Sequence, residues 1–585
     1  MNNRPGSRVG SWQGRLSRRS LLRGAATAGG GLAALSLVGC GDSESDDGSS
    51  SGSNAATGAG TASSSTAVAS GEPQRGGNLR IARDSSITQP DPYRNASGAA
   101  LPLYGAISDR LLDLNPQDGT LAPSLIAEWE EVETGLEYVF KLQPDAKWQD
   151  IAPTNGRPFD AEDVIHNIEY AAGLATPDDN SNIARKSWYF GIANLEAVDD
   201  KTVRMRLSEP NAPMLSAMAE QRQPITPREV MDGLDLTDFE KIPSIGPFVV
   251  SHYRDGESAM FERNPAYWRT PYPYVDTTEI KFFGDDQSAR AAFFAGDIDI
   301  YRPNGASSVK EVQQASGTQL HIAPFRAQQV IFINTKRFPD ARIWKAMHYL
   351  FDYQGTMDAV FGDGYWELTG PVNSALPGAL TPTDVSQLAG YNSATRDADI
   401  AEAKQLLDAA GYPGGDGLSF ELTQSSASGP AFDLAVRFQA GLKQLVPDLR
   451  FELRPEEDAA TFSQKVTRDR EFDMVNYLLY EGPDVRIAAL NYKTGGSRNY
   501  ASYSDPKVDE LIDRTYGESG EAMFSTVAEI QTHLIEDGVP VIACGTINDT
   551  MATRENVHGL QERMGPGSSG AANLAQTERG YVWLS

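Results

Sequence analysis

The chain contains 585 residues, with 79 acidic and 51 basic side chains and a formal net charge of −28 at pH 7. This length is too great for a single hydrophobic core, so two or three lobes are expected. The negative field repels nucleic acid and anionic lipid headgroups, which makes both unsuitable partners. It tolerates cationic or zwitterionic solutes, but we interpret it mainly as a solubility device.

The first 39 residues are typical of an export signal. Ser17-Arg18-Arg19-Ser20 supplies paired arginines, a weakly apolar run extends from Gly24 to Gly39, and Leu37-Val38-Gly39-Cys40 has the form of a lipoprotein cleavage box. The run is shorter than the roughly 20 residues of a spanning helix, which disfavours a plain membrane anchor. We expect residues 1–39 to be a twin-arginine lipoprotein signal peptide, and Cys40 to carry the lipid.

A polar linker and a scarcity of cysteine follow. Residues 40–76 are mostly Ser, Gly, Ala, Thr and Asp, a composition that predicts a disordered, lipid-anchored linker. The only other cysteine is Cys544. If Cys40 is acylated, no intramolecular disulfide is expected, and Cys544 in its apolar run is interpreted as a buried small hydrophobe.

Strand and helix patterns alternate in the rest of the chain. Alternating or β-branched runs predict strands over 78–83, 138–142, 202–207 and 329–334. Helices are predicted after the caps Asp160 and Asp505-Pro506, with Asp163 near the capping-box position, and over 398–410 before Gly411. The fold class is therefore α/β with more than one lobe.

Several collinear segments carry a family resemblance. They are Gly76-Gly77-Asn78-Leu79-Arg80-Ile81-Ala82, Asp109-Arg110-Leu111-Leu112, Leu121-Ala122-Pro123-Ser124-Leu125, Gly156-Arg157-Pro158-Phe159-Asp160-Ala161-Glu162-Asp163-Val164, Arg263-Asn264-Pro265-Ala266-Tyr267-Trp268, Phe294-Ala295-Gly296-Asp297-Ile298-Asp299, Phe472-Asp473-Met474-Val475 and Tyr503-Ser504-Asp505-Pro506. In this order, across about residues 76–545, the chain resembles the extracytoplasmic solute-binding proteins of ABC importers, family 5, the peptide/nickel-binding class.

The resemblance implies a type II periplasmic-binding-protein-like fold, with two lobes joined by crossing strands and an extra inserted domain. On this chain it places lobe I at 77–112, 236–320 and 536–585, the extra domain at 113–235 and lobe II at 321–535. Most of the shared residues are expected to be structural, Trp148 and Trp268 as core aromatics among them.

A peptide ligand would require an acid for its ammonium group, because a buried unpaired charge is costly. In relatives an aspartate soon after the Phe-Asp strand has this role, commonly after a tryptophan. Here Leu479 stands at the tryptophan position and Gly482 near the aspartate position, so Glu481 and Asp484 are the nearest acids and our two candidates. Both could instead be solvated loop acids.

Further ligand-binding candidates lie where strands are expected to end. They are Tyr480 and Asn476 beside the acids, Tyr93 and Arg94 after the first strand, and Asn264 and Arg302 near later strand exits. Arg486 or Arg498 could compensate a ligand carboxylate, although exposed surface arginines would explain both.

Two other chemistries have weaker support. The six histidines show no metal-ligand spacing, so no metal site or cofactor is expected, and a chelated nickel carried by an organic ligand is left as an alternative. Ser307-Ser308-Val309-Lys310 and Lys493-Thr494-Gly495 match two motifs of penicillin-recognising serine hydrolases. The intervening Ser-x-Asn or Tyr-x-Asn element is absent, and Ser307 follows a turn-rich stretch better suited to a loop.

The expected function is a lipid-tethered receptor, not an enzyme, with no catalytic residues. It would capture a peptide-like or other small zwitterionic solute, or alternatively an opine or oligosaccharide, between its lobes. The expected partners are ABC permease subunits with a separate ATPase, and the membrane through the lipid anchor. We expect a monomer in the periplasm or on the outer face of the cytoplasmic membrane.

Overall fold

The fold was established from a computed structural model. It describes residues 72–83, 91, 93–94, 101–116, 119–133, 135–175, 183, 185–231, 238–323, 327–427, 429–456, 458–518, 520–538, 540–560 and 580–585. The predicted signal peptide, Cys40 and nearly all of the predicted linker lie outside these residues. Within them, no helix is both long and apolar enough to cross a membrane.

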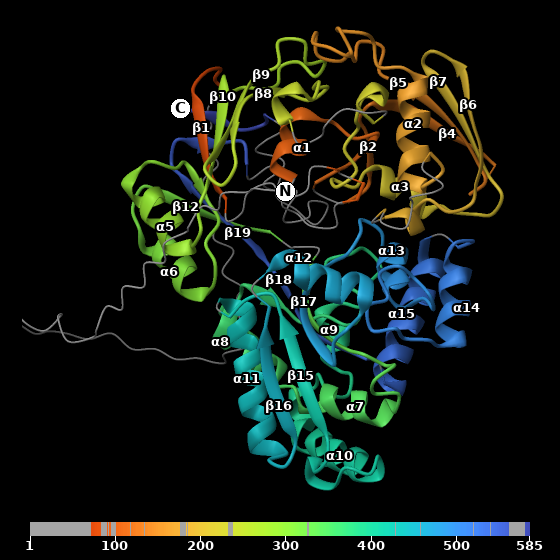
Figure 1. Ribbon diagram of the computed structural model, residues 1–585, viewed down its shortest axis with the longest axis vertical. Coiled ribbons are helices and arrows are strands. Elements are labelled where there is room, and N and C mark those ends of the chain that lie inside the picture. Colours follow the sequence, from red (N-terminus) through yellow and green to blue (C-terminus); the bar gives the residue numbers. More distant parts are fainter. Residues whose placement is uncertain are drawn as a thin grey trace, which may run out of the picture. The chain divides into compact units, whose positions relative to one another are not determined.

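A seven-stranded sheet in the order β12-β19-β11-β1-β10-β9-β8 forms the first layer among the described residues (Figure 1). Its strands are β1 (Asn78–Arg83), β8 (Phe248–Arg254), β9 (Ser258–Arg263), β10 (Thr277–Phe282), β11 (Ile300–Tyr301), β12 (Thr318–Ala323) and β19 (Asp549–Arg554). The predicted strand 78–83 is confirmed: it pairs in parallel with β10 and buries Leu79 and Ile81.

The second sheet has six strands in the described part of the chain, in the order β14-β18-β13-β17-β15-β16. They are β13 (Ala327–Ile333), β14 (Trp366–Glu367), β15 (Ser419–Gln424), β16 (Arg450–Pro455), β17 (Met474–Tyr480) and β18 (Val541–Ile547). Strand β13, predicted two residues further on, is central and buried along its whole length, which explains its run of apolar residues. Helices α7 (Ala341–Leu350), α8 (Tyr353–Phe361), α10 (Arg396–Ala409) and α11 (Pro430–Leu445) surround this sheet (Figure 1).

An antiparallel sheet in the order β4-β5-β7-β6 forms a third group of strands, with helix α2 (Ala161–Ala172) packed against it. The strands are β4 (Ile126–Glu133), β5 (Glu137–Leu142), β6 (Ile192–Asp199) and β7 (Thr202–Leu207). The predicted capping box of α2 is confirmed: the Asp160 side chain accepts from the Asp163 backbone N–H, and the Asp163 side chain accepts from that of Asp160.

The other α-helices and strands of the described residues follow here. They are α1 (Leu101–Ile107), β2 (Leu112–Leu114), β3 (Leu121–Pro123), α3 (Pro213–Met218), α4 (Arg228–Met231), α5 (Asp286–Ala295), α6 (Ala306–Gln314), α9 (Pro382–Val385), α12 (Ala459–Ser463), α13 (Val485–Ala489), α14 (Pro506–Thr515), α15 (Gly520–Asp537), β20 (Val557–His558) and β21 (Trp583–Leu584). Helix α14 begins at the predicted cap, where Asp505 accepts from the backbone N–H of Lys507.

The two larger sheets are connected by consecutive strands. Strand β12 belongs to the seven-stranded sheet and β13 to the six-stranded one, and the chain returns from β18 to β19. Only Asn548 separates β18 from β19. The boundary of lobe I expected at residue 536 is therefore wrong for β18, because this strand forms its ladder with β13 and β14 in the six-stranded sheet.

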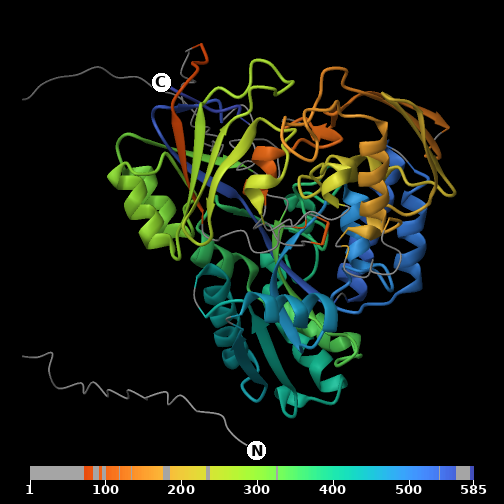
Figure 2. The same ribbon diagram turned by 45° about the horizontal axis from the view of Figure 1, so that its top comes forward.

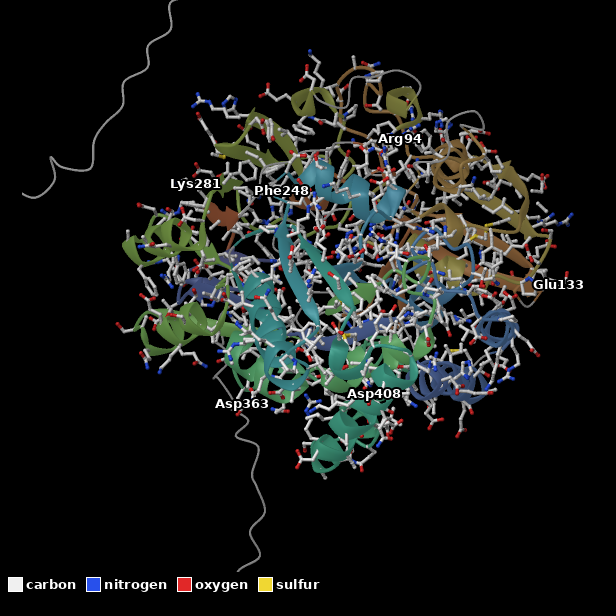
Figure 3. All side chains as sticks on the ribbon, turned by 60° about the horizontal axis from the view of Figure 1, so that its bottom comes forward. Arg94, Glu133, Phe248, Lys281, Asp363 and Asp408 are labelled. Carbon is white, nitrogen blue, oxygen red and sulfur yellow. The ribbon has the colours of Figure 1, made fainter. Side chains whose placement is uncertain are left out.

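Separate apolar clusters fill the three groups of elements. One surrounds β13 and contains fully buried Cys544, another contains Leu79 and Phe248, and a third contains Trp148 beneath the four-stranded sheet. Trp268 is only partly buried at the edge of the third cluster. Figure 3 labels the exposed acids Glu133 and Asp363 towards the outer edge of the view, which agrees with a role in solubility.

Candidate functional site

Hydrogen bonds between distant segments define a candidate site where residues 185–222 meet residues 480–498. The Tyr480 hydroxyl donates to Glu220 Oε2 over 3.0 Å, across 260 positions of sequence. Ser216 Oγ donates to Asp484 Oδ2 over 3.4 Å. These contacts join the chain around α3 to the segment that follows β17. We call this set of contacts the boundary site.

Local structure positions the boundary residues. Tyr480 is the last residue of β17, so its side chain stands where the central strand leaves the sheet. Asp484 caps α13 by accepting from the Arg486 backbone N–H over 2.9 Å. Ile487 of α13 packs into the apolar cluster beneath the four-stranded sheet, which holds this helix against the region of α3.

Glu220 and Arg222 form the charged centre of the boundary site. Arg222 Nη1 lies 3.2 Å from Glu220 Oε1, and its guanidinium carbon lies 3.6 Å from the centre of the Tyr480 ring. Burial on its own would raise the pKa of Glu220, but the charges of Arg222 and Arg185 hold that pKa below its usual value. Glu220 is therefore an anion already neutralised by protein groups.

Two more arginines extend this centre. Arg498 donates through Nη2 to the Tyr480 carbonyl oxygen. Burial lowers the pKa of Arg185 to about 10, against the opposing effect of Glu220. The Nε atoms of Arg222 and Arg498 are buried and have no hydrogen-bond partner among the described residues. Guanidinium donors of this kind can hold a carboxylate or another anionic oxygen group.

Glu481 does not face the boundary site. Its side chain is fully buried, with Oε1 accepting from Gln328 Nε2 over 3.0 Å and Oε2 accepting from the Asn373 backbone N–H over 2.7 Å. Burial raises the pKa of this carboxyl group to about 8. Both oxygens are engaged within the protein, so Glu481 connects the end of β17 to the loop at Asn373.

Asp484 lies at the boundary but is paired. Its carboxylate receives Arg486 Nε over 2.9 Å and Nη2 over 2.7 Å, in addition to Ser216. Arg486 is consequently neutralised by its neighbour, which leaves it poorly placed to compensate a ligand carboxylate.

The space at Gly482 explains why no acid stands there. A Cβ atom at this position would lie 2.5 Å from Ile487 Cγ2 and 3.1 Å from Trp188 Cη2. Trp188, which is buried, thus occupies the volume that a side chain at residue 482 would need.

The remaining candidates are distributed elsewhere and have structural contacts. Buried Asn476 donates to the Ala431 carbonyl, and buried Asn264 donates to the Gly246 carbonyl over 2.8 Å. Arg302 pairs with Asp549 over 2.7 Å, beside the link between β18 and β19. The structure therefore brings together Tyr480, Asp484 and Arg498, but not these three.

Tyr93 and Arg94 also make local contacts. The Tyr93 hydroxyl donates to Asn167 of α2, and its ring centre lies 4.9 Å from that of Tyr170. Arg94, labelled in Figure 3, pairs with Asp91 over 3.1 Å. Tyr93 is thus part of the core beneath the four-stranded sheet.

Glu220 and Arg222 were not identified from the sequence. They lie in the run Glu220-Gln221-Arg222-Gln223, whose four polar side chains are all buried. The signal available in the sequence was this run of four polar residues between apolar Met218 and Ile225. Charged side chains in such a position are rarely buried without a partner.

The hydrolase motifs are not brought together. Ser307 lies in the first turn of α6, not in the expected loop, while Lys493 follows α13. Helices α6 and α13 lie on opposite sides in both views (Figures 1 and 2). Within the described residues, no group of three or more His, Cys, Asp or Glu side chains could hold a metal ion.

Two sheets joined where one strand follows directly on another, with polar side chains at the boundary between lobes, are typical of solute-binding proteins. The family model for bacterial extracellular solute-binding proteins, family 5, matches residues 120–500. The chain therefore belongs to this family, whose members serve ABC transporters.

Known relatives agree with this assignment. The chain is 25% identical over 514 residues to the uncharacterized protein y4wM of Sinorhizobium fredii, covering 76% of this chain and 74% of that protein. DppA from Helicobacter pylori in complex with the peptide STSA superposes with a TM-score of 0.73 at 19% identity, covering 87% and 98% of the two chains. AgaA of A. tumefaciens R10 in complex with agropinic acid gives 0.74 at 19% identity, covering 87% and 99%. The predicted type II fold is confirmed.

Proposed function

We propose that this protein captures a peptide-like or other small zwitterionic solute between its two lobes and delivers it to membrane permease subunits served by a separate ATPase. The observation that supports this proposal is the boundary site, where Tyr480 at the end of β17 contacts Glu220 and Arg222, which follow α3. A solute that contacts both sides stabilises the closed arrangement, because only differential binding shifts such an equilibrium.

The polar groups available support this solute class. Arg222 and Arg498 offer donors for a carboxylate. Of the two acids expected from the sequence, Asp484 is the one that reaches the boundary site, through Ser216. We assign a solute ammonium group to Asp484, which would bind it in addition to or in place of Arg486, because both oxygens of Glu481 are fully buried. The site therefore offers charges of both signs.

An opine is the second candidate. AgaA, which shares the fold, was solved with agropinic acid, and DppA with a tetrapeptide. A small carboxylate-rich solute would use the same arginine donors without needing a counter-acid at Asp484.

The test is a screen of peptides and opines by isothermal titration calorimetry, combined with small-angle X-ray scattering. The proposal predicts stoichiometric binding of at least one solute and a smaller radius of gyration on binding. A protein that stays open with every solute of both classes would contradict it.

Tyr480→Phe makes the test specific to the boundary site. Loss of the hydroxyl that donates to Glu220 should weaken the identified solute about five- to tenfold, since one such bond contributes about 1 kcal/mol. Tyr412→Phe, three residues beyond the end of α10, is the matched control and should leave the affinity unchanged. Equal affinities of the two variants would remove Tyr480 from the site.

A further inference from the structure

A cavity of about 880 Å³ lies beside the boundary site, with a volume in the range of small-molecule pockets. Its walls come from residues 187–190 and 209–210 on one side and from 490–498 and 513–517 on the other. In both views the C-terminal helices α14 and α15 lie next to the region of the four-stranded sheet (Figures 1 and 2). No residue of this cavity takes part in the proposed solute contacts except Arg498.

The cavity has an aromatic wall. Trp188, Phe190 and Tyr516 line it, and the rings of Phe190 and Tyr516 meet edge to face with centres 5.0 Å apart. Leu490 and Pro210 add aliphatic surface. A flat apolar group of a ligand would find complementary ring faces and edges here.

Unpartnered donors lie in the same wall. Trp188 is 1% exposed, and its indole Nε1 has no acceptor among the described residues. Arg498 uses Nη2 on the Tyr480 carbonyl, while its buried Nε has no partner in the described part of the chain. Buried donors without acceptors are uncommon, and each is satisfied when a bound molecule supplies an oxygen.

The other charges that line the cavity limit the ligand class. Lys493 pairs with Asp513, and Arg514 pairs with Glu518 over 3.3 Å and with Glu529 over 3.1 Å. Exposed Glu209 is the remaining acid of the lining. Of the lining cations, Arg498 alone forms no ion pair with an acid of the described residues.

We propose that this cavity is a second binding site, which takes an aromatic carboxylate. The aromatic body packs against Trp188, Phe190 and Tyr516, and the carboxylate accepts from Arg498 Nε and Trp188 Nε1. This site shares Arg498 with the boundary site, whereas its other lining residues lie outside the proposed solute contacts. The inference does not depend on the identity of the transported solute.

The test uses N-acetyl-L-phenylalanine and its uncharged amide, titrated calorimetrically into the full-length protein. The acid should bind with one-to-one stoichiometry and the amide at least tenfold more weakly. Arg498→Gln should remove the preference for the acid, and Arg498→Lys, which keeps the charge but loses Nε, should restore it only in part. Lys493→Gln, which alters a paired lining cation, should leave the affinity within twofold.

Two further variants separate this site from the proposed function. Trp188→Phe, which keeps an aromatic ring but removes the N–H donor, should weaken the acid and not the amide. Tyr480→Phe should leave the affinity for N-acetyl-L-phenylalanine within twofold, even where it weakens the transported solute. Equal binding of acid and amide, no binding of either, or an unaltered preference in folded Arg498→Gln would overturn the proposal.

Discussion

Glu481 places a carboxyl group in the protein interior at the end of β17. Burial raises its pKa to about 8, although the hydrogen bonds from Asn373 and Gln328 and the charge of Arg498 act in the opposite direction. In the unfolded chain the pKa of a glutamate is about 4.3. The folded state therefore binds the proton more tightly, and this stabilisation is complete below the unfolded value and is lost as the pH rises towards 8.

Glu481→Gln should remove this pH dependence, because glutamine cannot ionise. The melting temperature of the variant relative to the wild type should increase from about pH 5 to about pH 8. Thermal unfolding followed by circular dichroism at several pH values measures the difference. Glu452→Gln, which changes an exposed glutamate on β16 of the same sheet, should give a difference that does not vary with pH. A flat difference for Glu481→Gln would contradict the expected role of burial.

For single residues, the sequence predicted which types of side chain the site contains better than it predicted which side chains contact one another. An acid was expected near residue 482, but strand alternation alone does not tell which of Glu481 and Asp484 faces the boundary. The pairing of Tyr480 with Glu220 spans 260 positions and depends on three-dimensional packing. The packing of the Trp188 ring beside Gly482, which leaves no room for a side chain there, likewise depends on three-dimensional packing.

The segment of residues 156–164 fixes helix α2 to its surroundings. Asp163, fully buried, accepts from Arg157 Nη1 over 2.6 Å, Arg157 Nη2 over 2.7 Å and Trp148 Nε1 over 3.0 Å. Arg157 also pairs with Glu229 over 2.6 Å. The segment from residue 156 to 164 therefore joins the start of α2 to the core beneath the four-stranded sheet and to α4.

Asp163→Asn should lower the free energy of unfolding by about 3 kcal/mol, because it leaves the buried side of Arg157 without its partner charge. Urea denaturation measures this loss. Glu128→Gln is the control: its pair with Lys141 has side chains 71% and 66% exposed, so its effect should be below about 0.5 kcal/mol. Similar losses in the two variants would show that Asp163 acts only as a helix cap.

Elements with local signals were predicted well. The strands 78–83 and 202–207 have the predicted bounds, and α2 and α14 begin at Asp160 and Asp505 as their caps required. Helix α10 ends at Ala409 before Gly411, whose φ of 94° suits glycine. Strand β18 was assigned to the wrong lobe because partner choice in a sheet is a long-range property that a strand's own residues do not encode.

Membrane attachment concerns the whole molecule. We expect the wild-type protein to be recovered in the membrane fraction, with a mature chain that begins at acylated Cys40. Fractionation and mass spectrometry of the N-terminal peptide measure both properties. Cys40→Ser should abolish acylation and release the protein, whereas Cys544→Ala, at the other cysteine, should leave attachment unchanged. Retention of an unacylated Cys40→Ser protein at the membrane would contradict the lipid tether.

The two links between the larger sheets also restrict how the lobes can move. In one, β12 ends at Ala323 and β13 begins at Ala327; in the other, only Asn548 separates β18 from β19. We expect two short links to favour rotation of one sheet against the other about the line that joins them. Lobes held in this way lose little orientational freedom when a solute binds. A small number of solute contacts would then be enough for tight binding.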